Sequence, residues 1–227
     1  MKNLVVALIF IITASVTAQD PITKEVGEFS TVKVYDLLNV EMVKSRKNKI
    51  EISGKNAKDV VIVNKNGTLK IRMKTEEYYD GNRTNIKLYY TSVDVIDVNE
   101  GAEITSDDTI KQFEIELKAQ EGGRITLDVK TTHTEIRSVT GGIVEVTGKT
   151  KNQDIAINTG GVFKGKDFKT ENTNVSIRAG GEADVNATEL LDIKIRAGGD
   201  VYVYGEPNKI NESRALGGRI KLKKAEE

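Results

Sequence analysis

Apolar and polar residues alternate through the second half of the chain in a pattern that recurs about every 19 residues. Each recurrence opens with a pair of glycines, and the pairs stand at 122–123, 141–142, 160–161, 180–181, 198–199 and 217–218. After each pair, apolar residues come two and four positions later, except that Gly165 takes the second of these places in one repeat, and mostly polar residues lie between them. Alternation with a period of two predicts a strand that has one buried face.

Residues at equivalent places in the repeat are predicted to form two apolar columns. The first contains Ile125, Val144, Phe163, Ala183, Val201 and Ile220, and the second contains Leu127, Val146, Val185, Val203 and Leu222. A second short strand precedes several glycine pairs, as in 155–157, 175–177 and 193–195. A repeat this short cannot bury its own apolar face, so successive repeats must stack.

The pattern therefore predicts an all-β parallel β-helix, a solenoid whose coils stack about 4.8 Å apart. Residues 102–227 are expected to form the regular coils, with one continuous stack over 103–224. Glycine suits the corners because it adopts positive φ without steric cost. A meander of hairpins would also alternate, but its turns need not recur in register. A phosphate-binding glycine loop would require a following helix, which the pattern does not predict.

Residues 19–101 are also rich in β-strand patterns, but they are less regular. Residues 60–73 predict a hairpin with a tight turn at Asn66-Gly67. Glu100-Gly101 resembles a degenerate glycine corner. We therefore expect residues 19–227 to form a single β-helical domain with an irregular start, and a separate small β-domain over 19–101 is the alternative.

Both ends of the chain carry signals. Residues 1–18 have the parts of a secretory signal peptide, with Lys2, an apolar run from Leu4 to Ile12 and a cleavage site after Ala18. An uncleaved anchor is the alternative, although the run is too short to span a bilayer, and the mature chain has no second apolar run. Lysines on the last strand, within Arg219–Lys224, discourage pairing of that edge and are interpreted as a cap.

Composition excludes several kinds of function. The chain has 34 basic and 34 acidic residues, so it lacks the basic excess typical of a nucleic-acid partner. It contains no cysteine, which excludes disulfides and thiol chemistry. Its one histidine, His133, is expected to be a solvated corner residue, and Asp107-Asp108 lacks the spacing of a calcium loop. We predict no catalytic residue, metal site or cofactor.

Six residues are candidates for binding. Arg178 and Arg196 occupy the same place in adjacent coils, where stacked like charges would favour an anion, and Lys194 and Arg214 lie near them in the repeat. Tyr202 and Tyr204 are expected to point outward together and could stack on a sugar ring. The alternatives are solvated arginines and a tyrosine cover over the last coils.

The chain also resembles a known family. A signal peptide is followed by Phe29–Val34, Lys49–Gly54 and Asn66–Ile71, and then by Gly-Gly coils and a late Val201–Pro207 segment. This arrangement is similar to the bacterial family called the putative auto-transporter adhesin head, or GIN domain, over nearly the whole mature chain. The resemblance implies a right-handed β-helix-like fold in an exported protein of Gram-negative bacteria, in the periplasm or at the cell surface.

These observations favour a non-catalytic cell-envelope or secreted module that presents a rigid β-surface to a glycan or a protein partner. A carbohydrate-active enzyme, a lyase or hydrolase on a β-helix, is the second hypothesis and rests on fold analogy alone. A structural or envelope-stress protein without a small ligand is the third.

Overall fold

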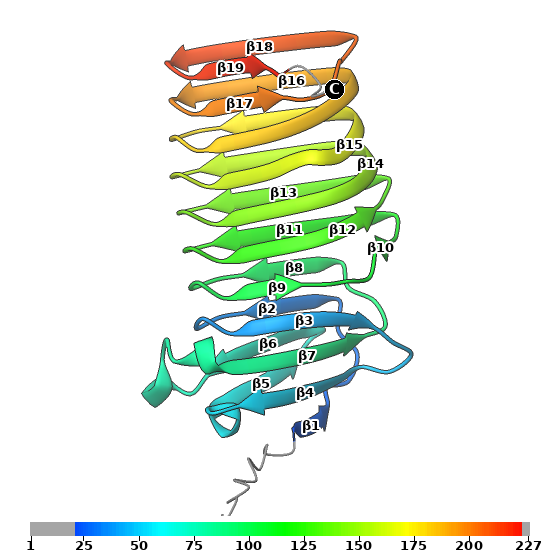
Figure 1. The fold of residues 1–227 in the computed structure, drawn as a ribbon, viewed down its shortest axis with the longest axis vertical. Helices are drawn as coiled ribbons and strands as arrows, with labels where there is room; N and C mark the ends of the chain where they lie inside the picture. Colours follow the sequence, from blue (N-terminus) through cyan, green and yellow to red (C-terminus); the bar gives the residue numbers. More distant parts are fainter. Residues whose placement is uncertain (1–20, 224–227) are drawn as a thin grey trace, which may run out of the picture.

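The computed structural model describes residues 21–223. The predicted signal peptide, and Lys224 in the predicted cap, lie outside the described residues. The described residues are mostly in strands, with almost no helix, and the strands stack into a β-solenoid of about seven turns (Figure 1). The predicted fold class, stacked coils of about 19 residues, is confirmed.

The irregular start combines strands with short 3-10 helices. Its elements are β1 (Ile22–Glu25), β2 (Thr31–Val34), β3 (Asn39–Lys44), β4 (Lys49–Gly54), η1 (Ala57–Asp59), β5 (Val60–Lys65), β6 (Thr68–Met73), η2 (Thr75–Glu77), η3 (Gly81–Arg83), β7 (Thr84–Tyr90) and β8 (Val95–Val98).

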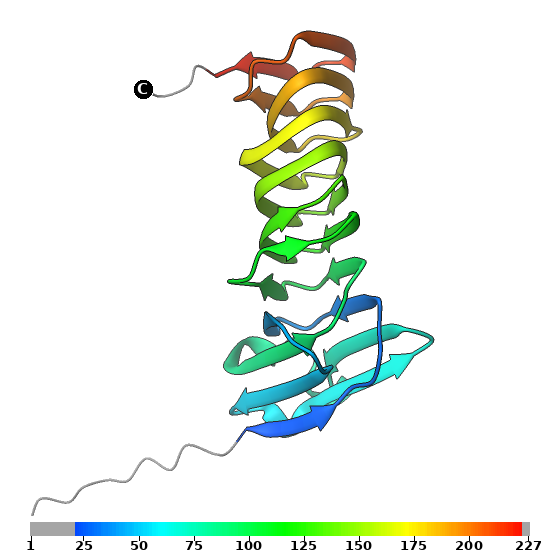
Figure 2. The same ribbon diagram turned by 90° about the vertical axis from the view of Figure 1, so that its right-hand side faces the viewer.

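The regular coils follow. Their strands are β9 (Glu103–Thr105), β10 (Ile110–Lys111), β11 (Glu114–Gln120), β12 (Arg124–Lys130), β13 (His133–Val139), β14 (Ile143–Asn158), β15 (Val162–Ile177), β16 (Glu182–Ala197), β17 (Asp200–Val203), β18 (Lys209–Leu216) and β19 (Arg219–Leu222). β14, β15 and β16 each run through a whole coil, around the rounded side that lies opposite the glycine corners (Figure 2).

Two parallel ladders enclose the interior. Face A consists of β6, β2, β8, β11, β13, the second halves of β14, β15 and β16, and β18. Face B consists of β7, β3, β9, β12, the first halves of β14, β15 and β16, and then β17 and β19. Each coil therefore contributes one strand to each face, and from β8 onward glycine stands at the corner between the two strands.

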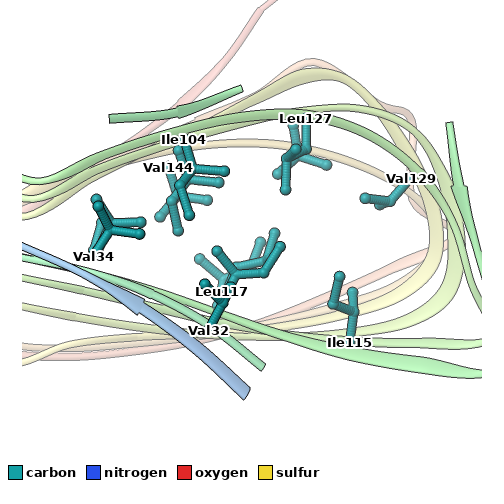
Figure 3. Packing of buried hydrophobic residues seen from close by; sticks show 14 of the residues in the cluster. Val32, Val34, Ile104, Ile115, Leu117, Leu127, Val129 and Val144 are labelled. Carbon is teal, nitrogen blue, oxygen red and sulfur yellow. The ribbon is translucent and has the colours of Figure 1, made fainter. Parts of the chain in front are cut away.

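Apolar side chains from the two faces meet inside the solenoid, as Figure 3 shows for Leu117 and Val144. The two predicted columns are buried from Ile125 and Leu127 through Val201 and Val203. They stop one coil before the prediction, because Leu222 is 70% exposed and Ile220 is only partly buried at the end of the stack. In one coil Gly165 replaces the apolar residue, and the ring of Phe163 occupies the space that a side chain there would need.

The two glycines of a corner serve different purposes. Gly160 has φ +74° and faces open space, so it is needed for the turn itself. A Cβ on Gly161 would lie 2.2 Å from the carbonyl oxygen of Ser138 in the preceding coil, so this glycine is needed because the coils approach closely. The sequence predicts the first requirement and not the second.

The strands of the irregular start do not stack in the order in which they follow one another along the chain. β2 pairs with β6 on one side and β8 on the other, and β3 pairs with β7 and β9. The first coil therefore lies between the coil of β6 and β7 and the coil of β8 and β9 (Figure 1). The hairpin at Asn66-Gly67 is confirmed, and Glu100-Gly101 forms a corner with positive φ at both residues.

The two ends of the stack differ. At the N-terminal end β4 pairs antiparallel with β7, β1 with β4 and β5 with β6, so the stack ends there in antiparallel strands. At the other end β18 and β19 each pair with only one strand of the described chain, and Lys221 lies on the outer strand. Residues 21–223 contain no helix with the length and apolarity that crossing a bilayer would require.

Candidate functional site

The outer surface of face A carries polar side chains in columns that run along the solenoid axis. One column contains Glu135, Asp154, Asn174 and Asp192 in register on successive coils. The next contains Arg137, Ala156, Ser176 and Lys194. Parallel strands place neighbouring members of a column about 4.8 Å apart, so each column is a continuous line of side chains.

A shallow groove of about 410 Å³ lies where the side chains of the second column are small. We call it the face A groove. Ala156 and Ser176 lie in the middle of that column, between the long side chains of Arg137 and Lys194. The groove is lined by Glu135, Asp154, Ile155, Ala156, Asn174, Val175, Ser176, Asp192 and Lys194.

The polar groups of the groove are held by contacts with one another. Asn174 Nδ2 donates to Asp154 Oδ1 at 2.8 Å, and His133 Nε2 lies 3.5 Å from Asp154 Oδ2. Lys194 Nζ lies 3.7 Å from Asp192 Oδ1. The carboxylates offer acceptors, while the amide and the ammonium offer donors. The expectation that His133 is a corner residue is wrong, because it begins β13 and is half-buried beside Asp154.

The structure brings three of the predicted binding residues to this part of face A. Arg178 and Arg196 follow Ile177 and Ile195, which are paired in register, so the two arginines occupy equivalent places in adjacent coils. Both are exposed, and neither forms an ion pair with another residue of the 21–223 segment. Lys194 lies two residues before Arg196 on the same strand and faces outward with it.

Arg214 does not belong to this group. It pairs in register with buried Ile195, and Ala215 stands where the arginine column would continue. At the open end of the stack, Arg214 Nη2 lies 3.0 Å from Glu212 Oε1, and Glu212 is in register with buried Ile193. The last coil thus places an ion pair at positions that are apolar in the coil before it.

The two tyrosines lie on the opposite face. Tyr202 is on β17 of face B and Tyr204 directly follows that strand; both are half-buried. Lysine ammonium groups lie over both rings, with Lys221 Nζ 5.0 Å from the Tyr202 centroid and Lys166 Nζ 5.6 Å from the Tyr204 centroid. The predicted set of six residues is therefore divided among face A, face B and the open end.

A larger hollow of about 500 Å³ lies on face B near the N-terminal end, and two of its acidic side chains, Glu41 and Glu51, are already paired. Lys87 Nζ lies 3.1 Å from Glu41 Oε2, and Lys49 Nζ lies 2.6 Å from Glu51 Oε1. The hydrogen bonds from Lys49 and from Tyr89 lower the pKa of Glu51. The face A groove is the better candidate because, beside it, Arg178 and Arg196 remain available to a ligand.

Comparisons with known proteins show which family the chain matches. A family model described as the putative auto-transporter adhesin head GIN domain matches residues 28–207. No curated protein matches the sequence.

Three solved structures have the same fold at low sequence identity. A putative adhesin from Bacteroides fragilis is 17% identical with a TM-score of 0.81, and the match covers 90% of this chain and 98% of that one. A putative adhesin from Parabacteroides merdae is 16% identical with a TM-score of 0.68, covering 90% and 96%. A putative lipid binding protein from Parabacteroides distasonis is 18% identical with a TM-score of 0.66, covering 92% and 98%. Because the family model spans most of the sequence, the chain belongs to the putative auto-transporter adhesin head GIN domain family.

Proposed function

We propose that this protein is a non-catalytic, exported binding module that presents the faces of its solenoid to a glycan at the cell envelope. The adhesin description of the family and of two structural neighbours supports binding as the function. The signal-like sequence of residues 1–18 supports export. A stack of paired strands is rigid, so its surface groups are held in place before a ligand arrives.

The observation that carries the proposal is the face A groove. Its floor is formed by the small side chains of Ala156 and Ser176. Its rim carries Asp154, Asn174 and Asp192 in register on successive coils. Sugar hydroxyls both donate and accept hydrogen bonds, so carboxylates, an amide and an ammonium in one shallow depression suit a glycan. A ligand lying along the axis would meet the same kinds of groups on successive coils.

Arg178 and Arg196 extend this surface toward the glycine corners. Their guanidinium groups can form paired hydrogen bonds with carboxylate or sulfate groups. We therefore expect the ligand to be an acidic glycan, with its hydroxyls in the groove and its anionic groups against the two arginines.

The test is a glycan-array screen of the mature protein, followed by titration of the best ligand. Ala156→Trp should fill the groove and abolish binding, whereas Thr126→Trp on face B should leave binding unchanged. Arg178→Glu/Arg196→Glu should weaken the binding of acidic ligands at low salt and have little effect on neutral ones. Absence of any glycan ligand, or binding unaffected by Ala156→Trp, would contradict the proposal.

A polysaccharide-cleavage assay accompanies the screen. The proposed function predicts that a bound oligosaccharide is recovered intact after prolonged incubation. Release of shorter products that depends on the groove residues would contradict the non-catalytic part of the proposal and establish an enzyme in its place.

A further inference from the structure

A second group of charged side chains gathers at the C-terminal end of face B. Lys164, Asp184, Tyr202 and Lys221 form one outward column, in register on four successive coils. Beside this column, Tyr204 follows β17 and Lys223 follows β19. We call the residues Lys164, Lys166, Lys221, Lys223, Tyr202 and Tyr204 the face B lysine cluster.

The tyrosine rings draw the ammonium groups together. Lys221 Nζ and Lys223 Nζ lie 5.0 Å and 4.9 Å from the centroid of the same Tyr202 ring. Lys166 Nζ lies 5.6 Å from the centroid of Tyr204. Cations at these distances are attracted by the aromatic face. Because lysines already lie over the rings, the tyrosines serve here to position positive charge, which differs from the sugar stacking expected from the sequence.

The lysines of the cluster differ in their acidic partners. Glu145 Oε2 lies 3.5 Å from Lys164 Nζ, so that lysine is paired. Lys221 and Lys223 form no ion pair with another residue in the described part of the chain. Two ammonium groups beside one ring repel each other, and a bound anion would relieve that repulsion.

Asp184 is the acidic residue at the centre of the cluster. It is half-buried, and burial together with neighbouring Glu182 raises its pKa to about 6. The charged and titratable groups around it come from four strands and the residues that follow them: Glu182 on β16, Lys164 and Lys166 on β15, Tyr202 and Tyr204 at β17, and Lys221 and Lys223 at β19. Protonation of Asp184 removes a negative charge from among these lysines.

We propose that the face B lysine cluster binds a linear polyanionic glycan that lies along the solenoid axis. Lys164 and Lys221 are three strand spacings apart, about 14 Å, with Asp184 and Tyr202 between them in the same column, so the lysines of the cluster follow the solenoid axis. Leu222 is in register with buried Val203, so its strongly exposed side chain lies on the interior side of β19 and not on the outward surface that carries the lysines. The cluster thus offers charge without the apolar groups that would enter a bilayer.

This site is separate from the face A groove, since the two lie on opposite faces of the stack. Its ligand affinity is expected to fall as salt rises, because exposed charges are screened. The affinity is also expected to rise as the pH falls from 7.5 to 5.5, because Asp184 loses its charge in that range.

The probe is a heparin-derived sulfated hexasaccharide, titrated into the full chain and compared with an uncharged hexasaccharide. Lys221→Glu/Lys223→Glu should weaken the binding of the sulfated probe by about tenfold or more. The matched control is Lys65→Glu/Lys70→Glu, which makes the same change in net charge at the other end of the stack and should alter binding by less than about twofold. Circular dichroism checks that each variant is folded, and Lys221→Gln/Lys223→Gln repeats the test without reversed charge.

The pH arm uses Asp184→Asn, which should bind the probe with an affinity that changes little between pH 7.5 and 5.5. Failure of the wild type to bind the sulfated probe, or equal weakening by the control pair, would overturn the proposal. Binding of phosphatidylglycerol vesicles without binding of the hexasaccharide would also overturn it, because the site would then recognise a lipid surface. Since neither lysine pair touches the face A groove, these outcomes leave the proposed function to be judged by its own test.

Discussion

The corner at Gly160-Gly161 allows the stacking of coils to be tested with two neighbouring substitutions. Gly160→Ala forces a side chain into positive φ in open space, which costs about 1–2 kcal/mol. Gly161→Ala has no φ penalty, but its Cβ would meet the Ser138 carbonyl oxygen of the preceding coil at 2.2 Å. This contact is with backbone, so the coils themselves must move apart.

The larger effect is expected at Gly161. The same Cβ would lie 2.7 Å from Ser138 Oγ, so it disturbs both the hydrogen bond from Val162 N to Ser138 Oγ, now 3.0 Å, and the bond from Ser138 Oγ to the Gly142 carbonyl. Two weakened hydrogen bonds of about 0.5–1.5 kcal/mol each and overpacking of about 1–3 kcal/mol together give about 2–6 kcal/mol for Gly161→Ala.

The assay is urea unfolding, with Lys164→Val as the surface control, which should change stability by less than about 0.5 kcal/mol. Gly160→Asn should be milder than Gly160→Val, because asparagine tolerates positive φ and a β-branched residue does not. Equal midpoints for Gly161→Ala and Lys164→Val would refute the reasoning, since they would mean that the coils do not approach as closely as described.

Three further predictions concern single side chains. Phe163→Ala should cost about 3–5 kcal/mol in urea unfolding, because the ring is fully buried in the interior column; a loss below 1 kcal/mol would contradict that packing. Lys33→Met should cost about 2 kcal/mol, because it leaves buried Asp97 without the ammonium that now lies 2.7 Å away, whereas Lys70→Met in the same column should be nearly neutral. Asp184→Asn should stabilise the fold by about 1–2 kcal/mol at pH 7.5, because the folded-state pKa of about 6 lies above the ordinary value of 3.8 and proton binding favours the folded state only at lower pH. That advantage should shrink as the pH falls through 6 toward 4, and an advantage that grows on acidification would show that the sign is wrong.

The regular coils could be predicted because every repeat carries its own copy of the signal. Ile125, Val144 and Phe163 share a column because each stands two residues after its glycine pair. The spacing of the pairs gives the coil length, and the distance from the pair decides which side of the strand a residue faces. The irregular start could not be predicted in the same way. The placement of β2 between β6 and β8 joins segments far apart in the chain, and no local pattern specifies which strand edge is free to receive another.

The candidate site could be predicted only in part from the sequence. Arg178 and Arg196 could be aligned because each stands two residues before its glycine pair, and Arg214 was misplaced because it stands three residues before the next pair. A shift of one residue moves a side chain from the outer to the inner face of a strand. The face A groove was not predicted because Ala156 and Ser176 are small residues that do not by themselves indicate a binding site. Their importance comes from being small between Arg137 and Lys194, which appears only when the coils are stacked.

The most direct test of the account is to observe the groove floor while a ligand binds. Ala156 is exposed in the face A groove, whereas Ala57 is buried at the other end of the molecule. In protein labelled at its alanine methyl groups, titration with the best glycan ligand should shift the NMR signal of Ala156 in a saturable way and leave Ala57 unchanged. Saturable glycan binding with no change at the Ala156 methyl would contradict the claim that face A carries the binding site.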